Sequence, residues 1–256
     1  MVYINKLFNL KDKVVTITGG AGYLCSEMAR GFNRAGCLVV LMDIDEEGTE
    51  RIAREIKQDG GQALALANDV TKKESFEHCL AIALEEFGKV DIMVNGAGIN
   101  APTSFLKISE KEWDRILAVQ LKGTLFGCQV FGKQMLEQGS GSIINISSAS
   151  AGPPLSKAFA YSAAKAGIRN LTMNLGREWA AQGVRVNALR PGFFPTEWNR
   201  QNFITPERER AILGHTPMAR FGEPSELVGA VIWLASDASS YATGTNLLVE
   251  GGWTAW

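Results

Sequence analysis

The sequence predicts an α/β protein with a single doubly wound parallel sheet and helices on both faces. Two observations support this. Short apolar runs of strand length alternate along the chain with polar or amphipathic segments of helical length. A chain of 256 residues also suits one large domain better than two. We therefore expect residues 1–256 to form one domain, with parallel strands joined by right-handed crossovers.

The first half supplies four expected strands, at 13–18, 37–43, 62–67 and 90–94. One helix before the last of these has a clear apolar face and ends at Gly88, a residue suited to a helix C-terminus. The apolar residues of that face are Phe76, Cys79, Leu80, Ala83, Leu84 and Phe87, at the spacings of one side of a helix.

The second half supplies three more strands, at 142–147, 184–189 and 245–249. A long helical stretch spans about 159–182, and a last helix opens at Pro224 and runs to about 235. Ligands of such sheets bind outside the carboxyl ends of the strands, at the topological switch point. The segments that follow the strands are therefore where functional residues are expected.

Composition excludes several classes of function. The net charge is -1 and no block of like charges occurs, which argues against nucleic acid or an anionic membrane as a partner. No apolar run approaches the ~18 residues of a membrane span. Four scattered cysteines and two distant histidines indicate neither a zinc site nor a disulfide framework, so no metal is expected. Free cysteines without an export signal favour the cytoplasm.

A glycine cluster after the first strand predicts a dinucleotide site. Gly19, Gly20 and Gly22 permit a tight turn into a helix, whose N-terminus attracts a pyrophosphate. Asp43 ends the second strand, where a carboxylate binds the ribose hydroxyls of NAD and repels the 2'-phosphate of NADP. The alternatives are an ordinary turn and an ordinary strand-end residue, and we favour NAD as the cofactor.

Several motifs, in this order, resemble the classical short-chain dehydrogenase/reductase family. They are TGGAGYLC at 18–25, NDV at 68–70, NGAG at 95–98, Ser148, YSAAK at 161–165 and PGFFPT at 191–196. The most specific part is Tyr161 and Lys165 at the start of a helix, with Ser148 thirteen residues before the tyrosine. The tail VEGGWTAW is also similar to members that act on gluconate and polyols. The resemblance implies a Rossmann-like fold and alcohol-ketone chemistry.

The spacing of these residues suits that chemistry. Tyr161 and Lys165, at i and i+4, share one helical face. A neighbouring ammonium and a positive nicotinamide ring lower the pKa of a phenol, which then takes the proton of a substrate hydroxyl while hydride leaves the same carbon. Ser148 is expected to hold the substrate oxygen. The structural alternatives are a buried Tyr with a satisfied hydroxyl, a solvated Lys and a Ser in a turn.

The resemblance also implies which residues hold the cofactor. Asn95 has an equally weighted alternative, which is to support the sheet through backbone hydrogen bonds, and Pro191 could simply form a turn after its strand. The full set is Gly19, Gly22, Tyr23, Leu24, Asp43, Ile44, Asp69, Val70, Asn95, Ala97, Tyr161, Lys165, Pro191, Phe194 and Thr196.

The sequence departs from the family pattern at three places. Tyr23 and Cys25 stand where glycine is usual, and NGAG replaces NNAG. Gln120 occupies the place of the catalytic Asn that completes a proton relay to the lysine. On a continuous helix Gln120 faces inward and needs a hydrogen-bond partner. It either takes over the relay or has a packing role, and we expect Gln120→Asn to keep or raise turnover.

The segment 193–217 is expected to cover the substrate. It mixes aromatic and polar side chains, as a polyhydroxylated ligand requires, and Arg200 could pair with a carboxylate. The alternative is a surface lid whose charges meet only water. The expected substrate contacts are Ser148, Ser150, Asn100, Trp198 and Arg200.

The sequence thus predicts an NAD-dependent oxidoreductase that interconverts a secondary alcohol and a ketone on a sugar, polyol or sugar acid. Two rivals remain: an NAD-binding sensor or scaffold without turnover, and a reductase of apolar or acyl ketones. The family resemblance implies a homo-oligomer, a tetramer or dimer. Helices around 109–136 and 159–182, with the tail after Gly252, are the expected interfaces.

Overall fold

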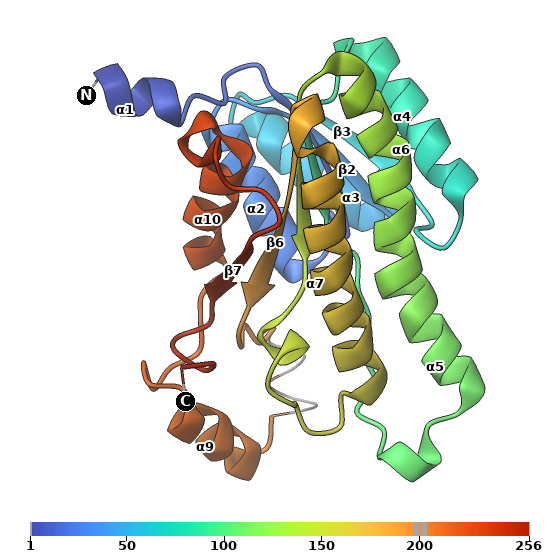
Figure 1. Cartoon of the computed structure of the whole chain (residues 1–256), viewed down its shortest axis with the longest axis vertical. Coiled ribbons are helices and arrows are strands. Elements are labelled where there is room, and N and C mark those ends of the chain that lie inside the picture. Colours follow the sequence, from blue (N-terminus) through green and yellow to red (C-terminus); the bar gives the residue numbers. More distant parts are fainter. Residues whose placement is uncertain (1, 197–199, 201–203, 256) are drawn as a thin grey trace.

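A computed structural model describes residues 2–196, 200 and 204–255. Seven parallel strands form one sheet in the order β3-β2-β1-β4-β5-β6-β7 (Figure 1). The strands are β1 (Val14–Thr18), β2 (Leu38–Asp43), β3 (Ala63–Ala67), β4 (Ile92–Asn95), β5 (Gly141–Ile146), β6 (Val184–Pro191) and β7 (Asn246–Val249). All seven predicted strands are confirmed within two residues at each end, and so is the doubly wound parallel sheet.

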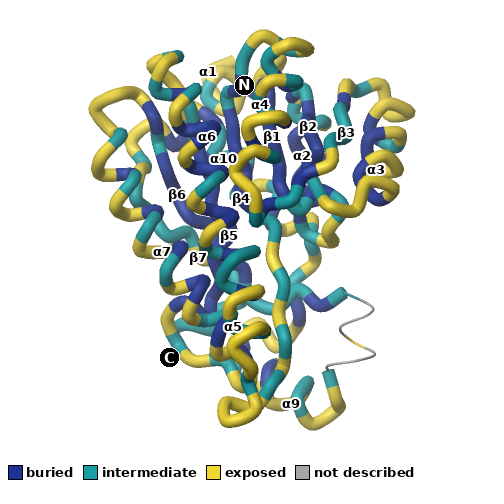
Figure 2. Tube along the Cα trace, turned by 90° about the vertical axis from the view of Figure 1, so that its right-hand side faces the viewer, coloured by how far each residue is buried: buried dark blue, intermediate teal, exposed yellow. Residues whose placement is uncertain are grey.

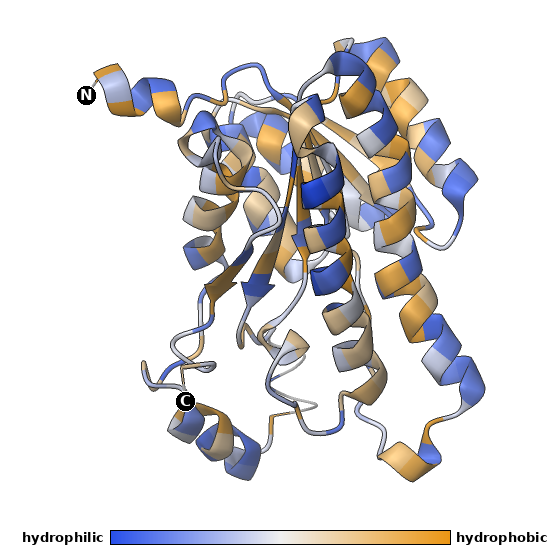
Figure 3. Cartoon of the chain, viewed as in Figure 1, coloured by the Kyte–Doolittle hydropathy of each residue, from blue (hydrophilic) through white to orange (hydrophobic). Residues whose placement is uncertain are grey.

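Helices cover both faces of the sheet, and the central strands bury side chains on both sides (Figures 1 and 2). One core packs β1 and β2 against α2 (Tyr23–Arg34), α3 (Glu46–Gln58) and α10 (Val228–Ala235). The opposite core packs the sheet against α4 (Lys73–Phe87), α6 (Gly123–Gln138) and α7 (Phe159–Trp179). The strands are hydrophobic because neither of their faces meets water, whereas the tip of β6 is hydrophilic (Figure 3).

The remaining helices are α1 (Val2–Leu7), α5 (Glu110–Leu117) and α9 (Pro206–His215). The helix expected to stop at Gly88 does so, because Gly88 adopts a left-handed φ of 74°. The helix expected from Pro224 begins as a 3-10 turn, Pro224–Leu227, before α10. One local difference matters for the site: α5 and α6 are joined by a π-helical turn, Ala118–Lys122, where a regular helix was expected.

The chain order creates a crevice beside β1. From β1 the sheet grows through β2 to β3, and the chain then returns to place β4 on the other side of β1. The segments that follow β1 and β4 therefore diverge from the carboxyl ends of these two strands. Sheets of this kind bind ligands at that point. The segments after β5 and β6 reach the same edge.

Candidate active site

The turn after β1 has the shape that a pyrophosphate requires. Gly19 has a φ of +72°, and a side chain there would also meet the backbone of Ala97 at 2.9 Å. Gly22 is the N-cap of α2 and no side chain caps that helix end. The first N–H groups of α2 are therefore available to an anion, which is how helix N-termini hold phosphate groups.

The two large residues of this turn leave its backbone accessible. Tyr23 is 44% exposed, whereas Cys25 is buried and contacts the position of Gly96, where any side chain would meet its Sγ. Burial raises the pKa of Cys25 to about 12, so its thiol stays neutral beside the turn. Leu24 lines the cavity described below. The departures at Tyr23 and Cys25 are thus accommodated without loss of the turn.

Asp43 lies at the carboxyl end of β2 beside this turn. Its Oδ2 accepts a hydrogen bond from the Ala21 N–H at 3.2 Å, and its Oδ1 accepts from the Asp45 N–H at 3.1 Å. No described Lys or Arg forms an ion pair with this carboxylate. Ile44 beside it is 76% exposed and offers an apolar surface for a base. This part of the site fits the adenosine half of a dinucleotide.

The other expected cofactor contacts differ in their support. The Asp69 carboxylate accepts hydrogen bonds from the Thr71 N–H and hydroxyl at 3.0 and 2.7 Å, and chiefly the hydroxyl bond lowers its pKa. Val70 is buried against the position of Gly123. Asn95 is 4% exposed and its Nδ2 donates to Asn145 Oδ1 at 2.8 Å. The Asn95 side chain is thus bonded within the core to the neighbouring strand, and both roles left open by the sequence stay predictions.

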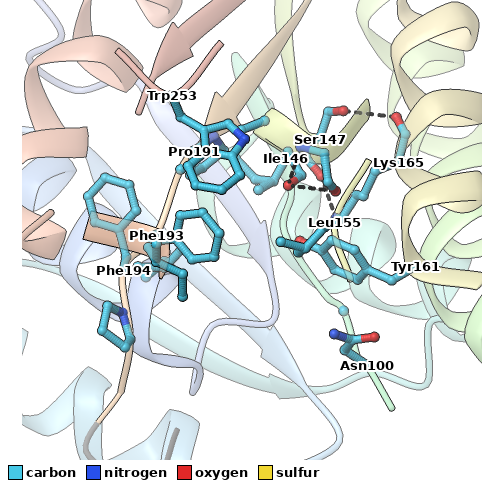
Figure 4. Close-up of a pocket in the computed structure, with 18 of the residues that line it drawn as sticks. Asn100, Ile146, Ser147, Leu155, Tyr161, Lys165, Pro191, Phe193, Phe194 and Trp253 are labelled. Carbon is cyan, nitrogen blue, oxygen red and sulfur yellow. Dashed lines mark hydrogen bonds between the residues drawn. The ribbon is translucent and has the colours of Figure 1, made fainter. Parts of the chain in front are cut away.

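Ser148, Tyr161 and Lys165 converge at the carboxyl end of β5 (Figure 4). Lys165 is 4% exposed, its Nζ donates to the Ile146 carbonyl at 2.6 Å, and it lies 5.5 Å from the centre of the Tyr161 ring. Ser148 and Tyr161 are hydrogen-bonded through their side chains. The sequence-based expectation that these three residues form one group is met in space.

The pKa values of this group are set by burial. Burial lowers the pKa of Lys165 from 10.5 to about 8. Burial also raises the pKa of Tyr161, and the hydrogen bond from Ser148 opposes that rise only in part. The expected lowering of the phenol pKa is therefore absent from the chain by itself, because desolvation outweighs the neighbouring groups.

Arg190 fixes the turn that carries Ser148. This residue, near the end of β6, is 7% exposed, and its Nε and Nη2 donate to the carbonyls of Ser148 and Ala149, each at 3.0 Å. The Ser150 N–H and hydroxyl also donate to Ser148 Oγ, both at 3.1 Å. Ser150 lines the cavity and thus has both an expected substrate position and a supporting role.

Gln120 lies in the π-helical turn and faces the cavity. It is fully buried, and its Nε2 donates to the Ile99 carbonyl at 2.7 Å. Its Oε1 is buried without a partner among the described atoms. The expectation of an inward-facing amide is confirmed, and the wider π-helical turn is a feature common at functional sites. The anchor at Ile99 favours the longer side chain, against our expectation for Gln120→Asn.

A cavity of about 460 Å³ adjoins these residues. One wall is aromatic, with the Trp253 ring centre 4.8 Å from that of Phe193 (Figure 4). Asn100, Leu155, Pro191 and Phe194 also line it. Among the described residues no group of three His, Cys, Asp or Glu side chains is placed to hold a metal ion. Searched over the same residues, no helix is long and apolar enough to cross a membrane.

The expected cover over the substrate is supported in part. Phe194 packs against the position of Gly222, whereas Thr196 is half-buried and does not line the cavity among the described residues. Trp198 lies outside the described residues. Arg200 is exposed and lies over the Phe221 ring at 4.9 Å, away from the described cavity lining. The geometry therefore does not support Arg200 as a substrate contact, because its guanidinium stacks on a ring elsewhere.

Lys157, Arg208 and Trp253 are among the cavity residues that were not singled out from the sequence. Lys157 lies four residues before the tyrosine, just ahead of α7, and Arg208 and Trp253 belong to α9 and the tail. A possible signal for Lys157 was its place just before the YSAAK motif. The sequence spacing gave no signal for Arg208 and Trp253, because only tertiary packing brings α9 and the tail to the cavity.

The fold and this site, where Ser148, Tyr161 and Lys165 line one cavity, are those of an oxidoreductase. The chain belongs to the short-chain dehydrogenase/reductase family: residues 22–254 match the family model described as Enoyl-(Acyl carrier protein) reductase. The oxidoreductase UxuB of Bacillus subtilis, of uncharacterised activity, is 39% identical over 97% of both chains. A 3beta-hydroxysteroid dehydrogenase of Eggerthella lenta is 40% identical over 96% of this chain and 95% of its own.

Carbohydrate dehydrogenases are also similar. A galactitol 2-dehydrogenase of Cereibacter sphaeroides is 37% identical over 98% of both chains. A gluconate 5-dehydrogenase of Burkholderia cenocepacia, solved with NADP and tartrate, superposes with a TM-score of 0.94 at 31% identity over 99% of both chains. A Haemophilus influenzae protein with bound NAD, provisionally named a D-mannonate oxidoreductase, gives 0.92 at 35% identity over 97% of both chains. These relatives support a sugar or polyol oxidoreductase.

Proposed function

We propose that the protein oxidises a secondary alcohol of a sugar, polyol or sugar acid to a ketone with NAD, and catalyses the reverse reduction. The observation that carries this proposal is the convergence of Ser148, Tyr161 and Lys165 on one cavity. That cavity lies at the sheet edge that also carries the open helix end behind Gly22. When bound, the nicotinamide ring accepts or returns the hydride.

The protein's own part is to hold the substrate oxygen and move its proton. Ser148 Oγ, fixed by Ser150 and by the Arg190 contacts to its turn, hydrogen-bonds the reacting oxygen. Tyr161 accepts the hydroxyl proton as the alcohol is oxidised and donates it to the carbonyl oxygen in reduction. Lys165 stabilises the phenolate, and its own ammonium is held by the Ile146 carbonyl. These groups are fixed by hydrogen bonds within the chain, which is the requirement for electrostatic stabilisation.

Gln120 gives the proton a route away from Tyr161. Its unpartnered Oε1 lines the same cavity as Lys165, and its amide is fixed at Ile99. A buried acceptor of this kind needs a water or a ligand as donor. Gln120 therefore takes over the relay that the family assigns to Asn, through a water placed by the longer side chain.

Asp43 supports NAD over NADP. Its carboxylate lies beside the turn and has no described cation to offset a 2'-phosphate. Replacing Asp43 with Ser should raise kcat/KM with NADP and lower it with NAD, because the repulsion and the ribose bonds are removed together. Measuring both cofactors with one substrate tests this, and an unchanged preference would contradict it.

Self-association through α5, α6 and α7 forms part of the proposal. These helices carry an apolar groove on their outer side that includes Leu117, Leu121, Leu125 and Leu171. Leu125 is 37% exposed. Leu125→Glu should therefore lower the assembly mass measured by light scattering. We also place the protein in the cytoplasm, supported by four buried cysteines that form no disulfide.

The first test is NADH formation across polyols, sugars and sugar acids, with Tyr161→Phe beside the wild type. Turnover on one class that is lost in the variant supports the proposal. Tight NAD binding without turnover on any alcohol would indicate the sensor. The aromatic wall at Phe193 and Trp253, together with the steroid dehydrogenase relative, makes the apolar-ketone reductase the second candidate. Activity on apolar ketones alone would favour it.

A further inference from the structure

The substrate cavity carries an excess of positive charge. Three cationic side chains line it, those of Lys157, Lys165 and Arg208, and no Asp or Glu appears among the described lining residues. The chain as a whole is balanced, with 26 Lys and Arg against 27 Asp and Glu, so this local excess does not follow from composition. Lys165 is held by the Ile146 carbonyl and belongs to the catalytic group. Lys157 and Arg208 are left without a function in the proposed reaction.

Lys157 is held in an unfavourable backbone conformation at the cavity. Its φ of 54° lies in the left-handed region, which is unfavourable for a residue with a side chain. The next residue, Ala158, is 1% exposed and so fixes the chain at this point. No described carboxylate forms an ion pair with the Lys157 ammonium. Strain of this kind concentrates where a side chain must be presented to a ligand.

Arg208 faces the same cavity from α9. Arg208 and Ile212, at i and i+4, both line the cavity and thus share the inner face of this helix. Arg208 is half-buried and forms no ion pair with a described acid, although Glu207 and Glu209 adjoin it in the chain.

Another arginine of the chain, unlike Arg208, forms an ion pair with a carboxylate. Arg220, which is more exposed, pairs with Glu226 at 2.6 Å. The Arg208 guanidinium is therefore available to bind a planar anion from outside the chain.

We propose that Lys157 and Arg208 form a carboxylate subsite, so that the preferred substrates are sugar acids, not neutral polyols. This inference rests on the proposed function and narrows its substrate class. A sugar acid supplies an anion for both cations and hydroxyls for Ser148, Ser150 and Asn100. A polyol would offer no counter-charge to the exposed Lys157 or to the half-buried Arg208, and an apolar ketone would also desolvate Arg208 without compensation.

The test compares acids with their matched polyols. D-gluconate is paired with D-glucitol, D-mannonate with D-mannitol and D-galactonate with galactitol, and kcat/KM is measured with NAD for each. The wild type should prefer the acid of at least one pair by about 10- to 100-fold. Arg208→Met and Lys157→Met should each raise the KM for that acid about tenfold, and the double variant should abolish the preference. Values for the polyols should stay within about threefold.

Two further measurements separate a lost contact from lost folding. Arg210→Met changes an exposed cation on the same helix that does not line the cavity among the described residues, and it should leave the preference intact. Calorimetric binding of the preferred acid to Tyr161→Phe with NADH present reports the subsite without turnover, and adding Arg208→Met should weaken it about tenfold.

The possible failures are distinct. Polyol turnover equal to that of the acids, or an acid preference that survives in the double variant, overturns the subsite while the dehydrogenase assignment stands. No turnover on any acid, polyol or apolar alcohol overturns the proposed function itself.

Discussion

Replacing Lys165 with Met should stabilise the protein in a pH-dependent way while it removes activity. The buried ammonium has a pKa of about 8 against an ordinary 10.5. At about 1.36 kcal/mol per pKa unit, holding it protonated costs the folded chain about 3.4 kcal/mol at pH 7. Loss of its bond to the Ile146 carbonyl offsets about 1–3 kcal/mol of the gain, at any pH.

The sign of the pH effect follows from proton binding. Between pH 8 and 10.5 the unfolded wild type binds more protons at this lysine than the folded form, so the wild type gains stability as pH rises. The difference in the free energy of unfolding between Lys165→Met and the wild type should therefore change by about 2 kcal/mol between pH 7 and 9.5, in favour of the wild type.

Urea unfolding of both proteins at the two pH values, at one protein concentration, measures this difference. Lys133→Met is the matched control, since that side chain is 78% exposed, and its difference from the wild type should not vary. A constant difference for Lys165→Met would refute the reasoning, because it would show that the ammonium keeps its ordinary pKa inside the site.

Three further changes test the surroundings of the catalytic group. Gln120→Asn should lower kcat/KM about tenfold, because the shorter amide loses its hydrogen bond to the Ile99 carbonyl. Unchanged turnover in steady-state assays would instead support the sequence-based expectation. Arg190→Met should lower kcat about 10- to 100-fold with a small change in KM, since it frees the turn at Ser148, and a rise in KM alone would contradict this. Gly19→Ala should weaken NAD binding at least tenfold by calorimetry, because its backbone is left-handed; unchanged affinity would contradict the turn geometry.

The fold could be predicted because its signals are local. The central strands β1 and β2 are buried on both faces, so each appears in the sequence as a mostly apolar run, and parallel order follows from the alternation with helices. The helix that ends at Gly88 was equally clear, since glycine alone adopts that φ without strain. The π-helical turn at 118–122 was missed because no sequence pattern distinguishes it from a regular helix.

The proposed catalytic group was also predicted from the sequence itself. The spacing of Tyr161 and Lys165 on one helix, and of Ser148 after a strand, fixes their approach once α7 packs on β5. The Asn95 side chain shows the limit of such reasoning: the motif left two roles open, and the bond of this side chain to Asn145 in the core was not among them.

Only the tertiary structure decided the charge of the substrate cavity. Arg200 had the side chain expected of a carboxylate ligand, yet it stacks on Phe221, whereas Lys157 and Arg208 face the cavity. Strands and catalytic spacings are set by neighbours within a few residues, so the sequence by itself determines them. Which cation faces a cavity depends on how α9 and the tail pack against the sheet edge, and those contacts join residues far apart in the chain.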